Sequence, residues 1–141
     1  MNVFEFDITE LKAYNAKLAA LAGGDISKFL TAETNKIGKM MLSDVKKLTP
    51  VGKYPPSSGK KGGTLRKGWR SKKLDKHTVK IFNSTEYALY VEYGHRTRSG
   101  GWVDGRRMLG RAEYNLMYGE NNINNILNAD LEKFFNDLLG S

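Results

Sequence analysis

Cysteine is absent from the 141-residue sequence, so a disulfide framework and a thiolate metal site are both excluded. No apolar run approaches the roughly 20 residues that a membrane-spanning helix requires. Residues 1–7 also lack the charged start and following apolar stretch of a secretion signal. These absences predict synthesis in the cytoplasm and no membrane partner, and nothing indicates an oxidising compartment.

Histidine is scarce, since His77 and His95 are the only two, and the carboxylates around them are scattered. This arrangement has none of the ligand spacings that mark a metal site. Residues 59–64 are rich in glycine and lysine, but they are expected to lead into a strand and lack the spacing of a phosphate-binding loop. We therefore predict no metal, no cofactor and no catalytic residue.

Positive charge is what the chain has in excess. There are 23 lysine and arginine residues against 15 acidic ones, which gives a formal net charge of +8. Such a charge favours binding to a polyanion or to an acidic protein face, but it does not distinguish the two. The length and the 40% apolar content fit a single domain, residues 1–141, with one modest core.

The spacing of apolar residues predicts two long helices, at 26–48 and at about 108–139. Gly119 and the pair Asn121-Asn122 are signals for a break or kink in the second one. An N-terminal helix is expected to begin at the N-cap Asp7 and to end at Gly23-Gly24. A short helix at 86–93 completes the helical set.

A change to alternating residues predicts a β-hairpin with strands at 65–74 and 78–83. Two strands alone are marginal, so a helix, an additional strand or a neighbouring subunit must complete the sheet. The expected fold class is therefore α+β, a small antiparallel sheet packed against the two long helices. Residues 49–64 and 94–107 are expected to be flexible loops.

Basic residues interleaved with Trp69 and Trp102 suggest a nucleic-acid-binding module, which would use backbone charge and base stacking. The basic residues are Lys60, Lys61, Arg66, Lys67, Arg70, Lys72 and Lys73 around the hairpin and Arg96, Arg98, Arg106 and Arg107 in the second loop. The alternative is that Trp69 lies in the core while the charges face water or an acidic partner.

Glu92 and His95 suggest a second alternative, a small ribonuclease. The two residues lie three apart and close to Arg96 and Arg98, so they could act as acid and base while arginine stabilises the negative charge. The competing interpretation has His95 solvated and Glu92 paired with an arginine. We favour the latter, because no pattern in the sequence places a base, an acid and oxyanion donors together.

Several segments occur in the order seen in one family of phage proteins. They are residues 49–52 (TPVG), 63–69 (GTLRKGW), 87–96 (YALYVEYGHR), 100–106 (GGWVDGR) and 108–109 (ML). Over roughly residues 25–115 the chain resembles the tail-completion, or head–tail joining, proteins of tailed bacteriophages and defective prophages. The resemblance implies a non-enzymatic morphogenetic protein with helices packed on a small sheet.

The resemblance also implies partners and a location. Members of that family form a ring at the virion neck, commonly a hexamer, around the DNA channel. The expected partners are therefore further copies of the chain, head-completion or connector proteins, the tail tube or tail terminator, and DNA in the channel.

The two basic loops carry the residues that we expect to make assembly contacts. Those in the second loop are Arg96, Arg98, Arg106 and Arg107, and those in the first are Lys53, Lys60 and Lys61. Tyr87, Tyr90 and Trp102 are expected to anchor the base of the second loop. We expect that loop to become ordered only on contact with a partner.

Overall fold

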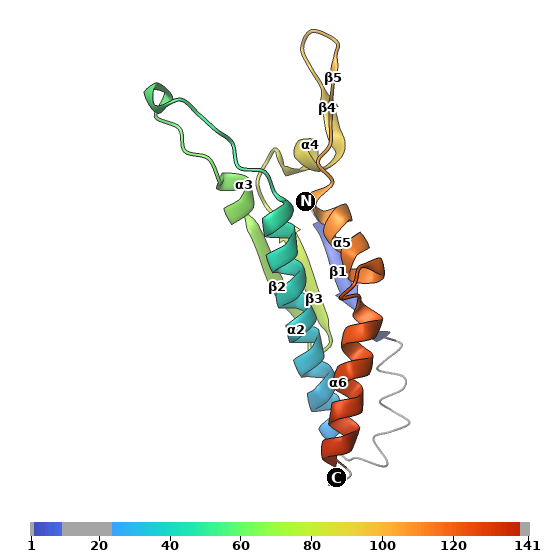
Figure 1. Cartoon of the computed structure of the whole chain (residues 1–141). Helices are drawn as coiled ribbons and strands as arrows, with labels where there is room; N and C mark the ends of the chain where they lie inside the picture. Colours follow the sequence, from blue (N-terminus) through green and yellow to red (C-terminus); the bar gives the residue numbers. More distant parts are fainter. Residues whose placement is uncertain (1, 10–23, 139–141) are drawn as a thin grey trace.

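The computed structural model describes residues 2–9 and 24–138. Long helices lie beside a small antiparallel sheet, and two thin arms project from the same end of the molecule (Figure 1). The fold class is α+β, as the sequence predicts. The N-terminal helix expected after Asp7 falls mainly on residues 10–23, which lie outside the described residues.

The helix α2, Asp25–Leu48, confirms the first predicted long helix. Its buried side chains recur every three or four residues, so they form one stripe that faces the sheet and α5. They include Ile26, Leu30, Ile37, Met41 and Val45. The helix ends at Thr49, whose backbone is extended, as expected for a residue that precedes proline.

The main sheet has three antiparallel strands in the order β1-β3-β2. The strand β3, Thr78–Asn83, is central, with β2, Trp69–Asp75, on one side and β1, Asn2–Asp7, on the other. The additional strand that the hairpin requires therefore comes from the N-terminus of the same chain. Val79 and Ile81 of β3 are buried on the sheet, which packs against α2.

The predicted strand at 65–74 is wrong over its first residues. Thr64–Lys67 form a short helix, α3, and the strand begins only at Trp69. Gly63 adopts φ 102°, a backbone conformation that favours glycine, and so turns the chain into this helical turn. The amide of Gly68 then donates to the carbonyls of Thr64 and Leu65, which completes the turn.

The second predicted long helix is divided into α5, Met108–Tyr118, and α6, Ile123–Leu138. Gly119 is extended and ends α5. The side chain of Asn122 donates to the Gly119 carbonyl and accepts the amide of Asn125, both at 3.0 Å. Asn122 therefore caps α6 and holds the break that the sequence signalled.

The region between the sheet and α5 also differs from expectation in one part. The short helix is confirmed as α4, Ala88–Tyr93, which begins two residues later than predicted and ends at the predicted residue. Residues 94–107 do not form an open loop, because β4, Gly94–Arg96, pairs with β5, Trp102–Asp104, in a second small sheet.

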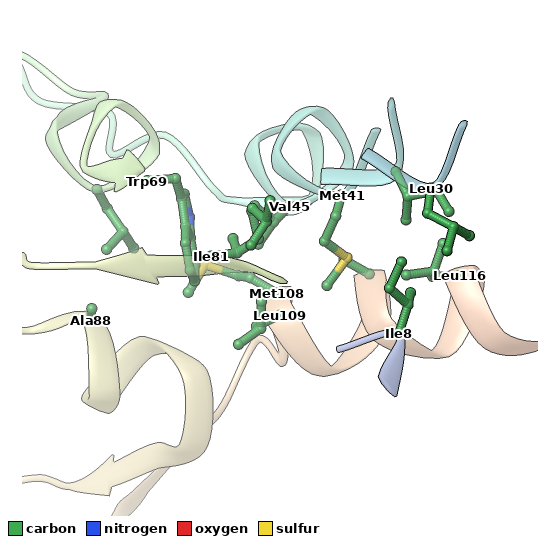
Figure 2. Close-up of a cluster of buried hydrophobic side chains, with 14 of the residues drawn as sticks. Ile8, Leu30, Met41, Val45, Trp69, Ile81, Ala88, Met108, Leu109 and Leu116 are labelled. Carbon is green, nitrogen blue, oxygen red and sulfur yellow. The ribbon is translucent and has the colours of Figure 1, made fainter. Parts of the chain in front are cut away.

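One core lies between α2, β3 and α5 (Figure 2). Its largest fully buried side chains include Trp69, Ile37, Met41, Ile81 and Met108. By contrast, α6 contains no buried residue. It contacts α2 through the rings of Phe29 and Phe134, whose centroids are 4.8 Å apart, and through the ion pair of Lys36 with Asp130. Among the described residues, no helix is long and apolar enough to cross a membrane.

Candidate interaction site at the two-armed end

Two arms distinguish one end of the molecule (Figure 1). The long arm is residues 50–63, between α2 and α3, and carries a single 3-10 turn, Pro56–Ser58. The hairpin arm is residues 94–107, between α4 and α5, and contains β4 and β5. All seven basic residues predicted to make assembly contacts lie on these arms. The structure therefore brings together at one end two groups that are more than thirty residues apart in the sequence.

The base of the long arm is tied to the core through Thr49. The indole nitrogen of buried Trp69 donates to the Thr49 hydroxyl at 2.8 Å, and that hydroxyl donates to the Val45 carbonyl at 2.6 Å. The guanidinium of Arg66 donates twice to the Thr49 carbonyl, at 3.1 and 2.7 Å. The residue from which the arm departs is thus held by α2, α3 and β2 at once.

The two sides of the long arm approach each other closely just above this base. A Cβ atom on Gly62 would lie 1.9 Å from the carbonyl oxygen of Gly52, so only glycine fits there without a shift of the backbone. Beyond this point every residue from 53 to 61 is exposed. The arm is therefore narrow at its base and surrounded by solvent beyond it.

Glu92 holds the base of the hairpin arm. Its side chain is only 2% exposed, and its carboxylate accepts the amides of Leu109 and Gly110, both at 3.0 Å. These are free amides of the first turn of α5, where a negative charge is favourable. Backbone bonds from Arg107 to the Glu92 carbonyl and from Arg106 to the Val91 carbonyl, at 3.1 and 2.6 Å, close the same base.

The ladder and turn of the hairpin arm depend on glycine as well. Gly94 has φ 87°, and a Cβ atom there would lie 2.5 Å from the carbonyl oxygen of Val103. At the tip, the Thr97 amide donates to the Gly101 carbonyl and the Gly101 amide donates to the Thr97 hydroxyl, both at 2.9 Å. The glycines that suggested an open loop instead permit a tight hairpin.

The three predicted anchor residues lie around the hairpin arm and are well exposed. Tyr87 is 44% exposed, while Tyr90 and Trp102 are each 59% exposed. Tyr90 packs edge-on against the ring of His95, with centroids 5.8 Å apart. Trp102 lies opposite Arg96 in the β4–β5 register. Each ring thus leaves much of its surface available to a partner.

The charge of the two arms is almost entirely positive. Their seven lysine and arginine residues are all exposed, and Asp104 is the only acidic residue within 50–63 and 94–107. In the part of the chain that the structure describes, the ion pairs are Lys36–Asp130 and Lys47–Asp44, and neither involves an arm. The arm cations are therefore uncompensated within these residues.

A cleft of about 330 Å³ lies between the bases of the arms. Leu65 and Val91 form part of its apolar lining, with Tyr54 and Tyr87 beside them. Lys61 of the long arm and Arg106 of the hairpin arm both line it. The cleft is therefore lined by residues of both arms.

The ribonuclease interpretation is not favoured by this geometry. Both carboxylate oxygens of Glu92 are occupied by the amides that begin α5, so the group caps a helix and is paired neither with His95 nor with an arginine. The sequence gives no local signal for this role, because the partners lie 17 and 18 residues further along the chain. Within the described residues, no group of three or more histidine and acidic side chains could hold a metal ion.

One cluster of ionisable residues lies away from the arms, between α2 and α6. Burial, together with the neighbouring Asp130, raises the pKa of Glu33 to about 7. Lys36 pairs with Asp130, and this hydrogen bond lowers the pKa of Asp130 and raises that of Lys36. The cluster joins the two helices and has no contact with the arms that would make it part of the site.

A family model described as "Bacteriophage HK97-gp10, putative tail-component" matches residues 12–94, which is more than half of the chain. The chain belongs to this HK97-gp10-like family of phage tail components. The match includes α2, the long arm, α3, the strands β2 and β3 of the main sheet and α4, and it ends where the hairpin arm begins. No curated protein and no solved structure matches the chain significantly. Membership identifies a structural protein associated with the tail of a virion.

Proposed function

We propose that this HK97-gp10-like protein is a tail-completion, or head–tail joining, component that assembles as a ring at the virion neck. The observation that carries the proposal is the pair of exposed basic arms held on rigid bases at one end of the chain. A joining protein needs such a surface, because it must bind partners while its own core stays folded. Its role is non-enzymatic, and Glu92 serves the architecture of the arm.

The arms supply the contacts in this proposal. Arg96, Arg98, Arg106 and Arg107 on the hairpin arm, and Lys53, Lys60 and Lys61 on the long arm, bind an acidic face of a neighbouring subunit or of a connector protein. The exposed rings beside them suit a protein interface, in which tyrosine, tryptophan and arginine are enriched. On the other side of the ring the partner is the tail tube or the tail terminator.

The free edge of the main sheet is a weaker candidate for contacts between subunits. Six of the seven residues of β2 are exposed, and Arg70, Lys72 and Lys73 are among them. Charged side chains on an edge strand, lysine above all, discourage pairing with another strand. We therefore assign the ring contacts to the arms and not to β2.

The experiment is in vitro joining of heads and tails that were produced without this protein. Added wild-type protein should yield joined particles, counted by electron microscopy, and the Arg96→Glu/Arg98→Glu variant should yield few or none. The matched control is Lys72→Glu/Lys73→Glu, which makes the same change of charge on β2 and should join normally. The mass of the native protein, measured alone and with tails, shows whether its copies assemble into a ring.

Two results would contradict the proposal. One is efficient joining of heads and tails in the absence of the protein. The other is normal joining by the Arg96→Glu/Arg98→Glu variant, which would remove the hairpin arm from the interface. Circular dichroism on each variant establishes that the fold is intact.

A further inference from the structure

The two arms also have the properties of a surface that binds a uniform polyanion. Their seven cations are exposed and unpaired within the described residues, with only Asp104 beside them. We propose that the arms bind the phosphate backbone of double-stranded DNA. This adds a second ligand to the proposed joining role, in which the same arms contact proteins, and it can be tested on the isolated chain.

The arrangement of the cations favours a long polymer over a compact acidic site. They lie on two separate arms, and Lys61 and Arg106 meet only at the cleft between the arm bases. A backbone with regularly spaced phosphates can meet both arms at once, and each contact releases counterions from the DNA. A single acidic side chain could satisfy only one of them.

The mechanics of the arms fit the same ligand. Their bases are held by the bonds to Thr49 and Glu92, whereas their tips contain Gly59 and Gly100, both at positive φ. A fixed base with an exposed tip, whose side-chain hydrogen bonds stay within the arm, can adjust to a phosphate backbone without disturbing the core. An arm with a fixed base and an adaptable tip suits the repeated phosphates of DNA better than a single ligand of fixed shape.

The aromatic residues on the arms lie next to cations. The ammonium of Lys60 lies 5.9 Å from the centre of the Tyr54 ring, and Trp102 pairs with Arg96 across the small sheet. Tyr54 and Trp102 are at least half exposed, so they can pack against sugar and base edges beside a bound phosphate. The arms thus offer both charge and flat apolar surface to one ligand.

The residues on the arms also predict that binding depends little on sequence. Neither arm contains asparagine or glutamine, the side chains that pair with adenine in the major groove, so contacts of arginine or lysine with guanine are the main direct base contacts that the arms offer. The threonines and serines of the tips are engaged within them, as in the contacts of Thr97 with Gly101 and of Ser58 with Pro55. We expect affinity for any duplex and a steep dependence on salt.

The test is a titration of a fluorescent duplex of random sequence, about two helical turns long, at salt between about 50 and 200 mM. The long-arm variant Lys53→Gln/Lys60→Gln/Lys61→Gln should bind at least tenfold more weakly and with a shallower salt slope. The matched control is Lys72→Gln/Lys73→Gln/Lys76→Gln, which removes the same charge from exposed lysines outside the arms. It should change the affinity less than about twofold.

Tryptophan emission provides a local readout. Trp69 is fully buried, so a change in emission on adding DNA should come from exposed Trp102 and should vanish in Trp102→Phe. Equal weakening by the long-arm and control variants would show that only net charge matters and would overturn the proposal. So would binding of poly-L-glutamate without binding of the duplex at the same salt, which would leave the arms as a surface for acidic proteins alone.

The outcome is separable from that of the joining experiment. A long-arm variant that loses DNA binding but still joins heads and tails would leave the proposed function standing. The reverse pattern, in which DNA binding is normal but particles do not join, would leave the DNA-binding proposal standing.

Discussion

The carboxylate of Glu92, at the end of α4, accepts the backbone amide of Leu109, in the first turn of α5, at 3.0 Å. The hairpin arm lies between these two residues in the sequence, so this bond and its companion to Gly110 close the base of the arm. A buried charge satisfied by two backbone donors is strongly held, because the site has little access to water.

Replacement of Glu92 should destabilise the chain. Glu92→Gln keeps an acceptor but loses the charge that favours the helix N-terminus, and we expect a loss of about 1 to 3 kcal/mol in the free energy of unfolding. Urea titration followed by circular dichroism measures it. Glu113→Gln, an exposed residue of α5, is the control and should change stability by less than about 0.5 kcal/mol. Equal stability of the two variants would show that the cap is unimportant.

The hydrogen bond between Thr49 and Trp69 should contribute to the free energy of unfolding, and a double-mutant cycle measures that contribution. Thr49→Val removes the acceptor of the indole N–H and leaves a buried donor unsatisfied, which should cost about 1 to 3 kcal/mol. Trp69→Phe removes the donor but also leaves a cavity. In a double-mutant cycle by urea unfolding, the two changes should show a coupling of at least about 0.5 kcal/mol. Strict additivity would mean that the two side chains act independently.

Stability should fall as the pH rises through neutrality, because of Glu33. Its pKa is raised from the ordinary 4.5 to about 7 in the folded chain, so the folded state holds this proton more strongly than the unfolded state. The contribution is fully present below pH 4.5 and is lost as the pH rises through about 7. Asp130, whose pKa is lowered, acts in the opposite direction and only at acidic pH, below this window.

The variant Glu33→Gln isolates this effect. Between about pH 5 and about pH 8 the free energy of unfolding of the wild-type chain should fall by about 1 to 2 kcal/mol because of this group. This value is smaller than the pKa shift alone would give, because solvent reaches the partner Asp130 and screens the interaction. Glu33→Gln should be flatter over the same window, because it lacks the carboxyl group that loses its proton there. Parallel pH profiles from thermal unfolding would contradict the assignment.

Much of the fold could be predicted because it depends on local periodicity. The apolar spacing of α2 and the alternation in β3 each create a continuous face, and that face has to be buried. The break between α5 and α6 was signalled by Gly119 and Asn122, both of which take part in it. The strand β1 was not predicted, although Phe4 and Phe6 alternate with acidic residues as in a strand.

The predictions were wrong where contacts between residues distant in the sequence override the local pattern. Alternation predicted a strand from Leu65 onward, yet Gly63 and the bond from the Asn83 side chain to the Leu65 carbonyl hold a helical turn over Thr64–Lys67. Glycines in 94–107 predicted an open loop, but they allow β4 and β5 to approach closely. Glu92 was expected to pair with a nearby arginine, but its carboxylate caps α5 instead.

By itself the sequence determined the fold class, the absence of thiol chemistry, the positive charge and the positions of the cations, because each follows from composition or from the spacing of neighbouring residues. Only the tertiary structure decided that those cations lie at one end, on arms held at Thr49 and Glu92. The reason is that both anchors are hydrogen bonds between residues 17 to 20 positions apart, and no local pattern specifies which donors and acceptors meet when the core closes.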